Sequence, residues 1–388
     1  HHPGTPQEFD EYFDQVKKIV IQQMKVFGEL PDYDYGEYTF LACYMPNVSG
    51  DGMEHRNSTV LTDVQSLGEG GMKENIGTVS HEFFHAWNVE RIRPKSLEPF
   101  DFTGANLSGA LWFAEGFTSY YTGLILKRSG IITPEEYVKS LNGTFNYVWN
   151  SPAREYFNPI EMSYQATFVD AAASIDPVNR ENTFISYYSY GSVLGLALDL
   201  KLREKGSNLD DFMKLMWEKY GEPEIPYTME DLERVLAGYA GKDFAKDFFS
   251  NYIYNSKMPD YEKLFAQVGL EIKQQKEKAY FGPSVRDSEE GFFIASNPGK
   301  GTPAYVAGLT KGDKILYVES KEITSQEDWD KQFGSFKPGD TIKISISRYG
   351  EEMEKEVKLQ PDPSYTITID EKAPEKAVKA REKWLYTK

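Results

Sequence analysis

Apolar residues recur at helical spacing through most of the first two thirds of the chain. Between residues 8 and 27 they form one stripe, made by Phe9, Phe13, Val16, Val20, Met24 and Phe27. The same spacing predicts further helices over residues 74–88, 109–129, 134–150, 190–205, 208–220, 228–238 and 242–254. The helix from residue 74 should end near Arg93, because Pro94 cannot continue it. Thr133 and Pro134 are a capping residue and a first-turn proline for the helix that follows them.

Strand-like runs occur in two places. Residues 38–45 and 58–65 read as strands joined by a turn-rich segment. After residue 258, one short helix over 325–336 lies among strands expected at 291–296, 314–320, 341–350 and 354–360. The predicted fold class is therefore α+β with several domains. We expect a helix-dominated domain with a small sheet (1–258), a β-rich domain (259–362) and a charged C-terminal tail (363–388).

Composition and charge narrow the choice of function. The 388 residues carry a formal net charge of −17 without a basic cluster, so a nucleic-acid partner is not expected. No apolar run approaches the roughly 20 residues of a transmembrane helix. Cys43 is the only cysteine, which excludes an intramolecular disulfide and cysteine-rich zinc sites. The opening HHPGT resembles a tag remnant. The compartment stays open between periplasmic or secreted and cytoplasmic, with a preference for the periplasm.

The sequence HEFFH at residues 81–85 is the strongest chemical signal in the chain. On a helix, residues four apart lie on one face, so His81 and His85 can bind the same metal ion. Glu82 can then take a proton from a water held at the open coordination position of a zinc ion. The alternative is an amphipathic helix with two incidental histidines, which is less plausible in a chain of so few histidines.

A catalytic zinc ion needs a third protein ligand. Glu115 stands among apolar and aromatic residues in LWFAEGFTSYY, where an unpaired carboxylate would be costly. Asp101, in an expected loop, is the weaker candidate. A second helix packed against the first would bring Glu115 beside both imidazoles, so Glu115 is our predicted third ligand.

These residues carry a family resemblance. HEFFHAWNVERIRP followed by LWFAEGFTSYY resembles the gluzincin metallopeptidases, and most closely the glycyl aminopeptidase family. The resemblance extends from about residue 35 to the end of the chain. It implies a thermolysin-like catalytic domain, one Zn²⁺ per chain and a C-terminal PDZ domain. Such enzymes normally have an N-terminal β-domain, and this chain begins about where that domain should end.

The resemblance also implies two further roles in the site. GDGMEHRNST matches the segment in which related aminopeptidases bind the free amine of the substrate, with Glu54 as the anchor and Gly52 giving the substrate access to the strand. His55 stands where those enzymes have Asn. The alternative for this segment is a hairpin turn with solvated charges.

A tyrosine is implied as the group that stabilises the oxyanion. In SYYSYGSVLG, Tyr188 is the matching position and Tyr187 the second choice, while Tyr190 replaces the usual Lys. Arg91 and Arg93 could bind a substrate carboxylate, but we expect them to satisfy carbonyls at the helix end. Glu90 replaces a basic residue common in the family.

Residues 301–323 are similar to the core of bacterial PDZ domains. Such domains add a peptide as an extra strand and hold its carboxylate in a loop of backbone N–H groups. Phe281 and Gly282 would form the centre of that loop, although Pro283 removes one donor. The alternative is a spacer or lid that binds no peptide.

The combined prediction is a zinc-dependent metallopeptidase, and more specifically an aminopeptidase acting on peptides with a free N-terminus, with glycine as the family's suggested preference. Glu82 and Tyr188 are the predicted catalytic residues. The alternatives are a zinc endopeptidase and a catalytically impaired peptide-binding protein that uses its PDZ domain.

Overall fold

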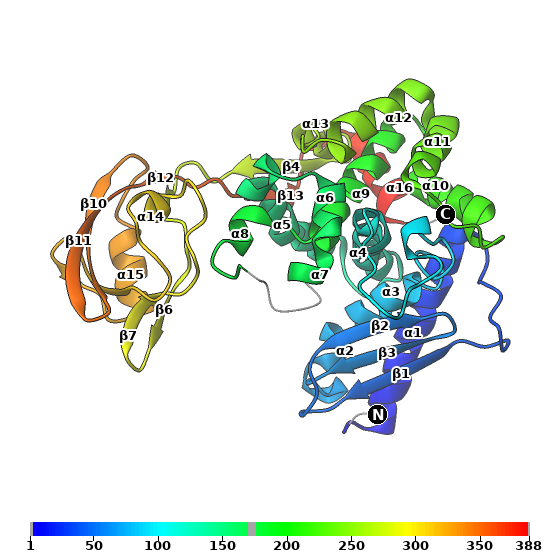
Figure 1. Ribbon diagram of the computed structural model, residues 1–388, viewed down its shortest axis with the longest axis horizontal. Coiled ribbons are helices and arrows are strands. Elements are labelled where there is room, and N and C mark those ends of the chain that lie inside the picture. The colour runs from blue at the N-terminus through cyan, green and yellow to red at the C-terminus, as the bar shows by residue number, and fades with distance from the viewer. Residues whose placement is uncertain (1–2, 170–175, 387–388) are drawn as a thin grey trace.

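Two separate hydrophobic cores organise the chain, one in a large helical domain and one in a smaller β-rich domain (Figure 1). The structure, a computed structural model, describes residues 3–169 and 176–386. The helical domain contains α1 (Pro6–Phe27), α2 (Gly71–Glu74), α3 (Ile76–Phe84), α4 (Leu111–Arg128), α5 (Pro134–Asn150), α6 (Pro159–Tyr164), α7 (Ala166–Val169), α8 (Arg180–Thr183), α9 (Tyr187–Glu204), α10 (Leu209–Met216), α11 (Met229–Ala240), α12 (Lys242–Phe248), α13 (Tyr261–Ala266) and α16 (Glu375–Leu385). The predicted fold class is confirmed.

The inward face of α1 differs from the predicted stripe. Phe9 and Phe13 are each 50% exposed, and their rings lie 6.2 Å apart on the surface. The buried face instead includes Tyr12, whose hydroxyl forms a 2.8 Å hydrogen bond with that of Tyr44. This tyrosine pair spans from the helix to the small sheet, and it sets a rotation of α1 that the apolar spacing alone does not fix.

The small sheet contains a strand that the sequence pattern missed. Its order is β1 (Thr39–Tyr44), β3 (Ser58–Asp63) and β2 (Asp51–His55), with β1 parallel and β2 antiparallel to β3. The segment expected to be only turns therefore contains β2 and a tight hairpin. Within the described residues β2 pairs only with β3, so its other edge is available to an extended partner.

Helix α3 ends earlier than Pro94 requires. Its last residue is Phe84, and His85 is the C-cap. The chain then turns, and Val89 adopts a φ of 113°, a strained conformation for a β-branched residue. The prediction of a helix running to about residue 88 and beyond is therefore wrong, because the chain must turn back toward α4.

Helices α4 and α9 cross with their backbones in direct contact. A Cβ atom on Gly191 would lie 1.8 Å from the carbonyl oxygen of Trp112, and one on Gly116 would lie 2.3 Å from the Cα of Gly191. Only glycine permits this approach. The crossing matters for function because Glu115 and Tyr188 stand directly beside it.

The β-rich domain is a sheet covered by short helices. The strand order is β11 (Glu351–Lys358), β10 (Thr341–Arg348), β8 (Lys314–Val318), β7 (Gly291–Ile294) and β6 (Val285–Ser288), with β9 (Lys321–Glu322) beside β8. The helices are α14 (Pro303–Val306) and α15 (Gln326–Phe333). The strands and helix that the sequence predicted here are all present.

This domain is inserted into the helical one (Figure 1). The entering segment contains β4 (Leu270–Gln274) and β5 (Ala279–Tyr280), which pair with β13 (Tyr365–Ile369) and β12 (Gln360–Pro361) of the leaving segment. Instead of the expected tail, β13 and α16 return to the first core, where Trp384 and Leu385 are buried. Since Tyr261 and Leu270 also belong to that core, the structural boundary lies beyond residue 258.

Lys300 of the β-rich domain contacts the helical domain, where its ammonium lies 2.8 Å from a carboxylate oxygen of Glu155. In residues 3–169 and 176–386, no helix combines the length and apolar character needed to span a membrane.

Candidate metal centre and active site

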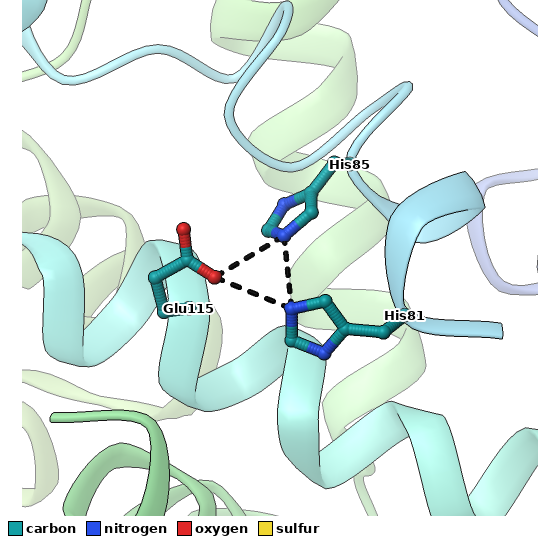
Figure 2. A group of neighbouring side chains, drawn as sticks. All are labelled: His81, His85 and Glu115. Carbon is teal, nitrogen blue, oxygen red and sulfur yellow. Dashed lines mark hydrogen bonds and ion pairs between the residues drawn. The ribbon is translucent and has the colours of Figure 1, made fainter. Parts of the chain in front are cut away.

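Three predicted metal ligands converge from two helices (Figure 2). His81 lies on α3, His85 caps it, and Glu115 lies in the first half of α4. The Nε2 atoms of the two histidines are 3.1 Å apart, and they lie 3.3 Å and 3.2 Å from Oε2 of Glu115. Figure 2 shows these atoms turned toward one another around a common point.

The spacing fits a tetrahedral zinc ion. Ligand atoms at about 2.0–2.1 Å from zinc in tetrahedral positions lie about 3.3 Å from one another. The observed separations of 3.1–3.3 Å match this value without any rearrangement. Two imidazoles and one carboxylate are also a ligand set typical of catalytic zinc, because they leave a fourth position free.

Each imidazole is oriented by a second hydrogen bond. Nδ1 of His85 lies 2.7 Å from the carbonyl oxygen of Asn88 and donates to it. Nδ1 of His81 lies 3.3 Å from the hydroxyl of Thr122, which itself donates to the carbonyl of Thr118 and therefore accepts from the imidazole. With Nδ1 committed to a hydrogen bond, Nε2 is the nitrogen that each ring turns toward the metal position.

Asn88 is a positioning residue whose role the sequence analysis missed. It is fully buried, and its amide donates to Ala114 O at 2.9 Å and to Phe113 O at 3.2 Å. These bonds attach the turn after α3 to the helix that carries Glu115. The available signal was an amide side chain inside an otherwise apolar helical pattern, where a buried polar group needs partners.

Glu82 lies against β2 rather than in open solvent. It is 6% exposed, and a Cβ atom on Gly52 would stand 2.2 Å from its Oε1. Gly52 was expected to give a substrate access to the strand, but the space it leaves is occupied by the Glu82 carboxylate. Oε2 of Glu82 has no hydrogen-bond partner among the described residues.

Burial and neighbouring charges set the protonation of the ligand cluster. Burial raises the pKa of Glu82 to about 8 in the metal-free chain, and the carboxylate of Glu54 adds to this. For Glu115, burial opposes ionisation, but the imidazole of His85 outweighs it and holds the pKa below its usual value. Burial also disfavours the charged form of His85, but the carboxylate of Glu115 outweighs it and raises the pKa of His85 to about 10. For His81, burial is the larger effect and lowers the pKa. Glu115 is therefore a carboxylate and is ready to bind a cation.

Glu54 lies at the same site. Positions two apart on a strand share a face, so Glu54 points to the side on which Gly52 contacts Glu82. Carboxylate oxygens of Glu54 and Glu82 and a ring nitrogen of His85 lie within 4.8 Å of one another. His55, by alternation, is exposed, and its Nδ1 lies 3.2 Å from the carbonyl oxygen of Met53.

The two candidate tyrosines occupy the first turn of α9. The ring of Tyr188 lies 5.8 Å from the ring of His81, and Tyr187 is stacked on Tyr188 at 5.0 Å. Tyr187 is 6% exposed and packs among apolar residues, whereas Tyr188 is partly exposed beside the histidine. Tyr190 is fully buried. Of these, Tyr188 is the residue that adjoins the metal ligands.

The other candidates lie elsewhere. Asp101 is exposed, and its carboxylate accepts hydrogen bonds from Thr103 in a surface loop. Arg91 is buried and donates to three backbone carbonyls, and Arg93 donates to Leu97 and Val89. Both arginines thus have the backbone role that we expected.

In the β-rich domain, Gly282 has a φ of 122°, and a Cβ there would lie 2.7 Å from Thr302. Phe281 is 4% exposed, and its ring packs 5.1 Å from that of Trp329 on α15. These residues lead directly into the edge strand β6. The loop therefore stands at the end of an unpaired strand edge, where a PDZ domain holds its ligand.

Comparison with known proteins identifies the families that two parts of the chain resemble. Residues 74–194 match the family model of the M61 glycyl aminopeptidase, and residues 279–359 match that of the PDZ domain. The first match contains HEFFH, Glu115 and Tyr188. The resemblance seen in the sequence is confirmed, and the chain carries a peptidase-family domain together with a PDZ domain. No curated protein matches the sequence.

An aminopeptidase N family protein from Idiomarina loihiensis has a similar structure, with a TM-score of 0.83 and 27% identity over 97% of this chain. This chain spans 66% of the length of that protein. An M1 zinc metallopeptidase from Deinococcus radiodurans aligns over 63% of this chain and 45% of its own, with 14% identity and a TM-score of 0.41. The latter is too distant to bear on function.

Proposed function

We propose that this chain is a zinc-dependent aminopeptidase that removes residues from the free N-terminus of peptides. His81, His85 and Glu115 hold the zinc ion, Glu82 is the general base, Tyr188 stabilises the oxyanion and Glu54 binds the amine of the substrate. The observation that carries the proposal is the position of Glu54, which brings a second carboxylate within 4.8 Å of both Glu82 and His85.

Zinc, when bound, supplies the Lewis acidity that makes a water molecule nucleophilic near neutral pH. The Glu82 carboxylate would accept a proton from the attacking water and pass it to the nitrogen of the departing amine. The poorly solvated position of Glu82 against Gly52 makes its carboxylate a stronger base than an exposed one. The hydroxyl of Tyr188 donates a hydrogen bond to the carbonyl oxygen as negative charge develops there.

The substrate backbone can align along the unpaired edge of β2. An extended peptide placed there would bring its N-terminal ammonium near Glu54 and its first carbonyl toward the metal ligands. A charge-assisted hydrogen bond between ammonium and carboxylate then fixes which peptide bond is cleaved. An N-blocked peptide loses this interaction and leaves Glu54 without a partner.

The test compares a peptide with a free N-terminus and the same peptide acetylated. The parent chain should release residues one at a time from the N-terminus of the free peptide and leave the acetylated peptide intact. Glu54→Gln should lower kcat/KM for the free peptide at least tenfold, since such bonds contribute about 1.5–3 kcal/mol. Glu37→Gln, at an exposed carboxylate before β1, is the matched control. Internal cleavage of the acetylated peptide at an equal rate would support an endopeptidase instead.

For the PDZ domain we propose capture of an extended peptide along the edge of β6. The support is the family match and the loop at Phe281 and Gly282 at the start of that edge. Fluorescence anisotropy with a labelled peptide tests this, and a peptide amidated at its C-terminus is the control. Equal binding of both peptides would show that the loop does not bind the carboxylate.

A further inference from the structure

Cationic side chains gather around a cavity at the end of the helical domain away from the metal centre. The cavity has a volume of about 1020 Å³ and is lined by seven Lys and Arg side chains against three carboxylates. It lies where α1, α4, α9, α10 and α16 meet, near the C-terminal end of the chain in Figure 1. On α4 it reaches Arg128, thirteen residues or about 20 Å along the helix from Glu115.

Helix dipoles explain only part of this clustering. Lys25, Arg128 and Arg203 stand in the last turns of α1, α4 and α9, where cations are favoured. Lys376, in contrast, is in the first turn of α16, where the helix dipole disfavours a cation. A local excess of positive charge is also unexpected in a chain whose formal net charge is −17.

Four of the seven cations are already paired, including Arg203 with Asp199 and Lys214 with Glu218, and the three carboxylates of the lining also have partners. Asp210 binds Arg128 at 2.8 Å and also accepts a hydrogen bond from Tyr121, and Glu375 binds Lys379 at 2.5 Å. The third, Asp211, is hydrogen-bonded to Asn208. Among the described residues, the ammonium groups of Lys25, Lys376 and Lys383 form no ion pair, and all three lysines are exposed.

Arg128 places a buried guanidinium in the wall of the cavity. Its side chain is 1% exposed, with Nη1 bound to Asp210 and Nη2 donating to the carbonyl of Trp384. The Nε–H is buried and has no acceptor in the described part of the chain. The guanidinium therefore adds positive charge to the wall of the cavity, while the exposed lysine ammonium groups provide the donors that can reach a bound anion.

We propose that this cavity binds a small, multiply charged anion of the phosphoryl class. Its volume suits a metabolite-sized ligand, and cations that converge from several helices suit a compact anion better than an extended acidic peptide. Arg and Lys together are the usual donors to phosphate oxygens. The bound anion joins α16, which follows the PDZ domain, to α1, and so stabilises the folded helical domain.

Isothermal calorimetry on the whole zinc-loaded chain tests the site. Fructose 1,6-bisphosphate is the probe, because its separated phosphates chelate zinc weakly, and sodium sulfate at equal ionic strength is the salt control. We expect saturable binding and a rise in Tm. The triple variant Lys25→Gln, Lys376→Gln, Lys383→Gln should bind the bisphosphate about tenfold more weakly. Each exposed ion pair makes only a small contribution to binding, so the three substitutions are combined to give a measurable loss of affinity.

The matched control changes three exposed lysines of the inserted segment, Lys276→Gln, Lys311→Gln and Lys321→Gln. It should bind the bisphosphate like the parent chain. Absence of saturable binding to the parent, equal weakening in both triple variants, or the same Tm rise with sulfate would overturn the proposal. Tighter binding of a polyglutamate peptide than of the bisphosphate would overturn the phosphoryl assignment. Peptidase activity is not needed for any of these readouts.

Discussion

The candidate metal centre and the proposed carboxylate loop of the PDZ domain are built in different ways. The metal centre combines residues from β2, α3, α4 and α9, which are far apart in sequence. It tolerates a buried Glu82 and a strained Val89. The PDZ loop is a contiguous stretch, and its one unusual backbone conformation is at Gly282, a residue that adopts it readily. A site assembled from distant segments depends on helix packing, whereas a loop depends on local conformation.

The largest expected effect tests the chemistry of the assembled site. Glu82→Gln removes the proton acceptor while keeping the shape that fits against Gly52. The rate of peptide cleavage should fall by roughly 10²–10⁴-fold, with zinc content and Tm unchanged. Steady-state kinetics on a free-amine peptide measure this. A fall in the cleavage rate of less than tenfold would show that Glu82 is not the general base.

Tyr188→Phe should have the next largest effect. Removing the phenol hydroxyl beside His81 should lower kcat by roughly 10²–10³-fold and leave KM nearly unchanged, because the hydroxyl acts mainly in the transition state. Tyr187→Phe, at the buried neighbour, should retain most activity. If Tyr187→Phe were the inactive variant instead, Tyr187 and not Tyr188 would be the residue that stabilises the oxyanion.

Helix packing is tested by Gly191→Ala. The added methyl group would overlap the carbonyl of Trp112, so α4 and α9 must separate, and the free energy of unfolding should fall by about 1–3 kcal/mol. Separation also moves Glu115 relative to the histidines, so zinc affinity should fall as well.

Gly143→Ala is the control, since nothing lies within 4 Å of a Cβ atom built at that position on α5. It should stabilise the helix by about 1 kcal/mol. Chemical denaturation measures the stability of both variants, and zinc titration measures their zinc affinity. Only Gly191→Ala should lose both.

The smallest effect is expected in the PDZ loop. Gly282→Ala should destabilise the PDZ domain by about 1 kcal/mol, because a methyl group at this φ is strained and meets Thr302. Peptide binding should weaken while the cleavage rate stays the same. Hydrogen exchange resolved by domain checks this. Faster exchange in α3 or α4 would show that the two regions are not independent.

The contrast also explains what the sequence could predict. His81, His85 and Glu82 follow from helical periodicity, and Glu115 from a carboxylate in an apolar helix, so each is visible locally. The end of α3, the packing of Gly52 against Glu82 and the role of Asn88 depend on contacts with distant segments. No local pattern contains that information.

The same distinction holds for the fold. The β-rich strands were predictable, because alternation and turn residues are local signals. The return of β13 and α16 to the helical core was not, because six of the eleven residues of α16 are charged and Trp384 packs on residues distant in sequence, such as Tyr120 and Tyr137. Charge dominates the local sequence of α16, and this led to the expectation of a tail.

The zinc content of the purified chain, measured beside that of Glu115→Ala, tests the central claim most directly. We expect about one zinc ion per parent chain and a large loss in the variant, which keeps its fold by circular dichroism. Absence of zinc in the parent after loading, or full retention in the variant, would contradict the three-ligand metal centre.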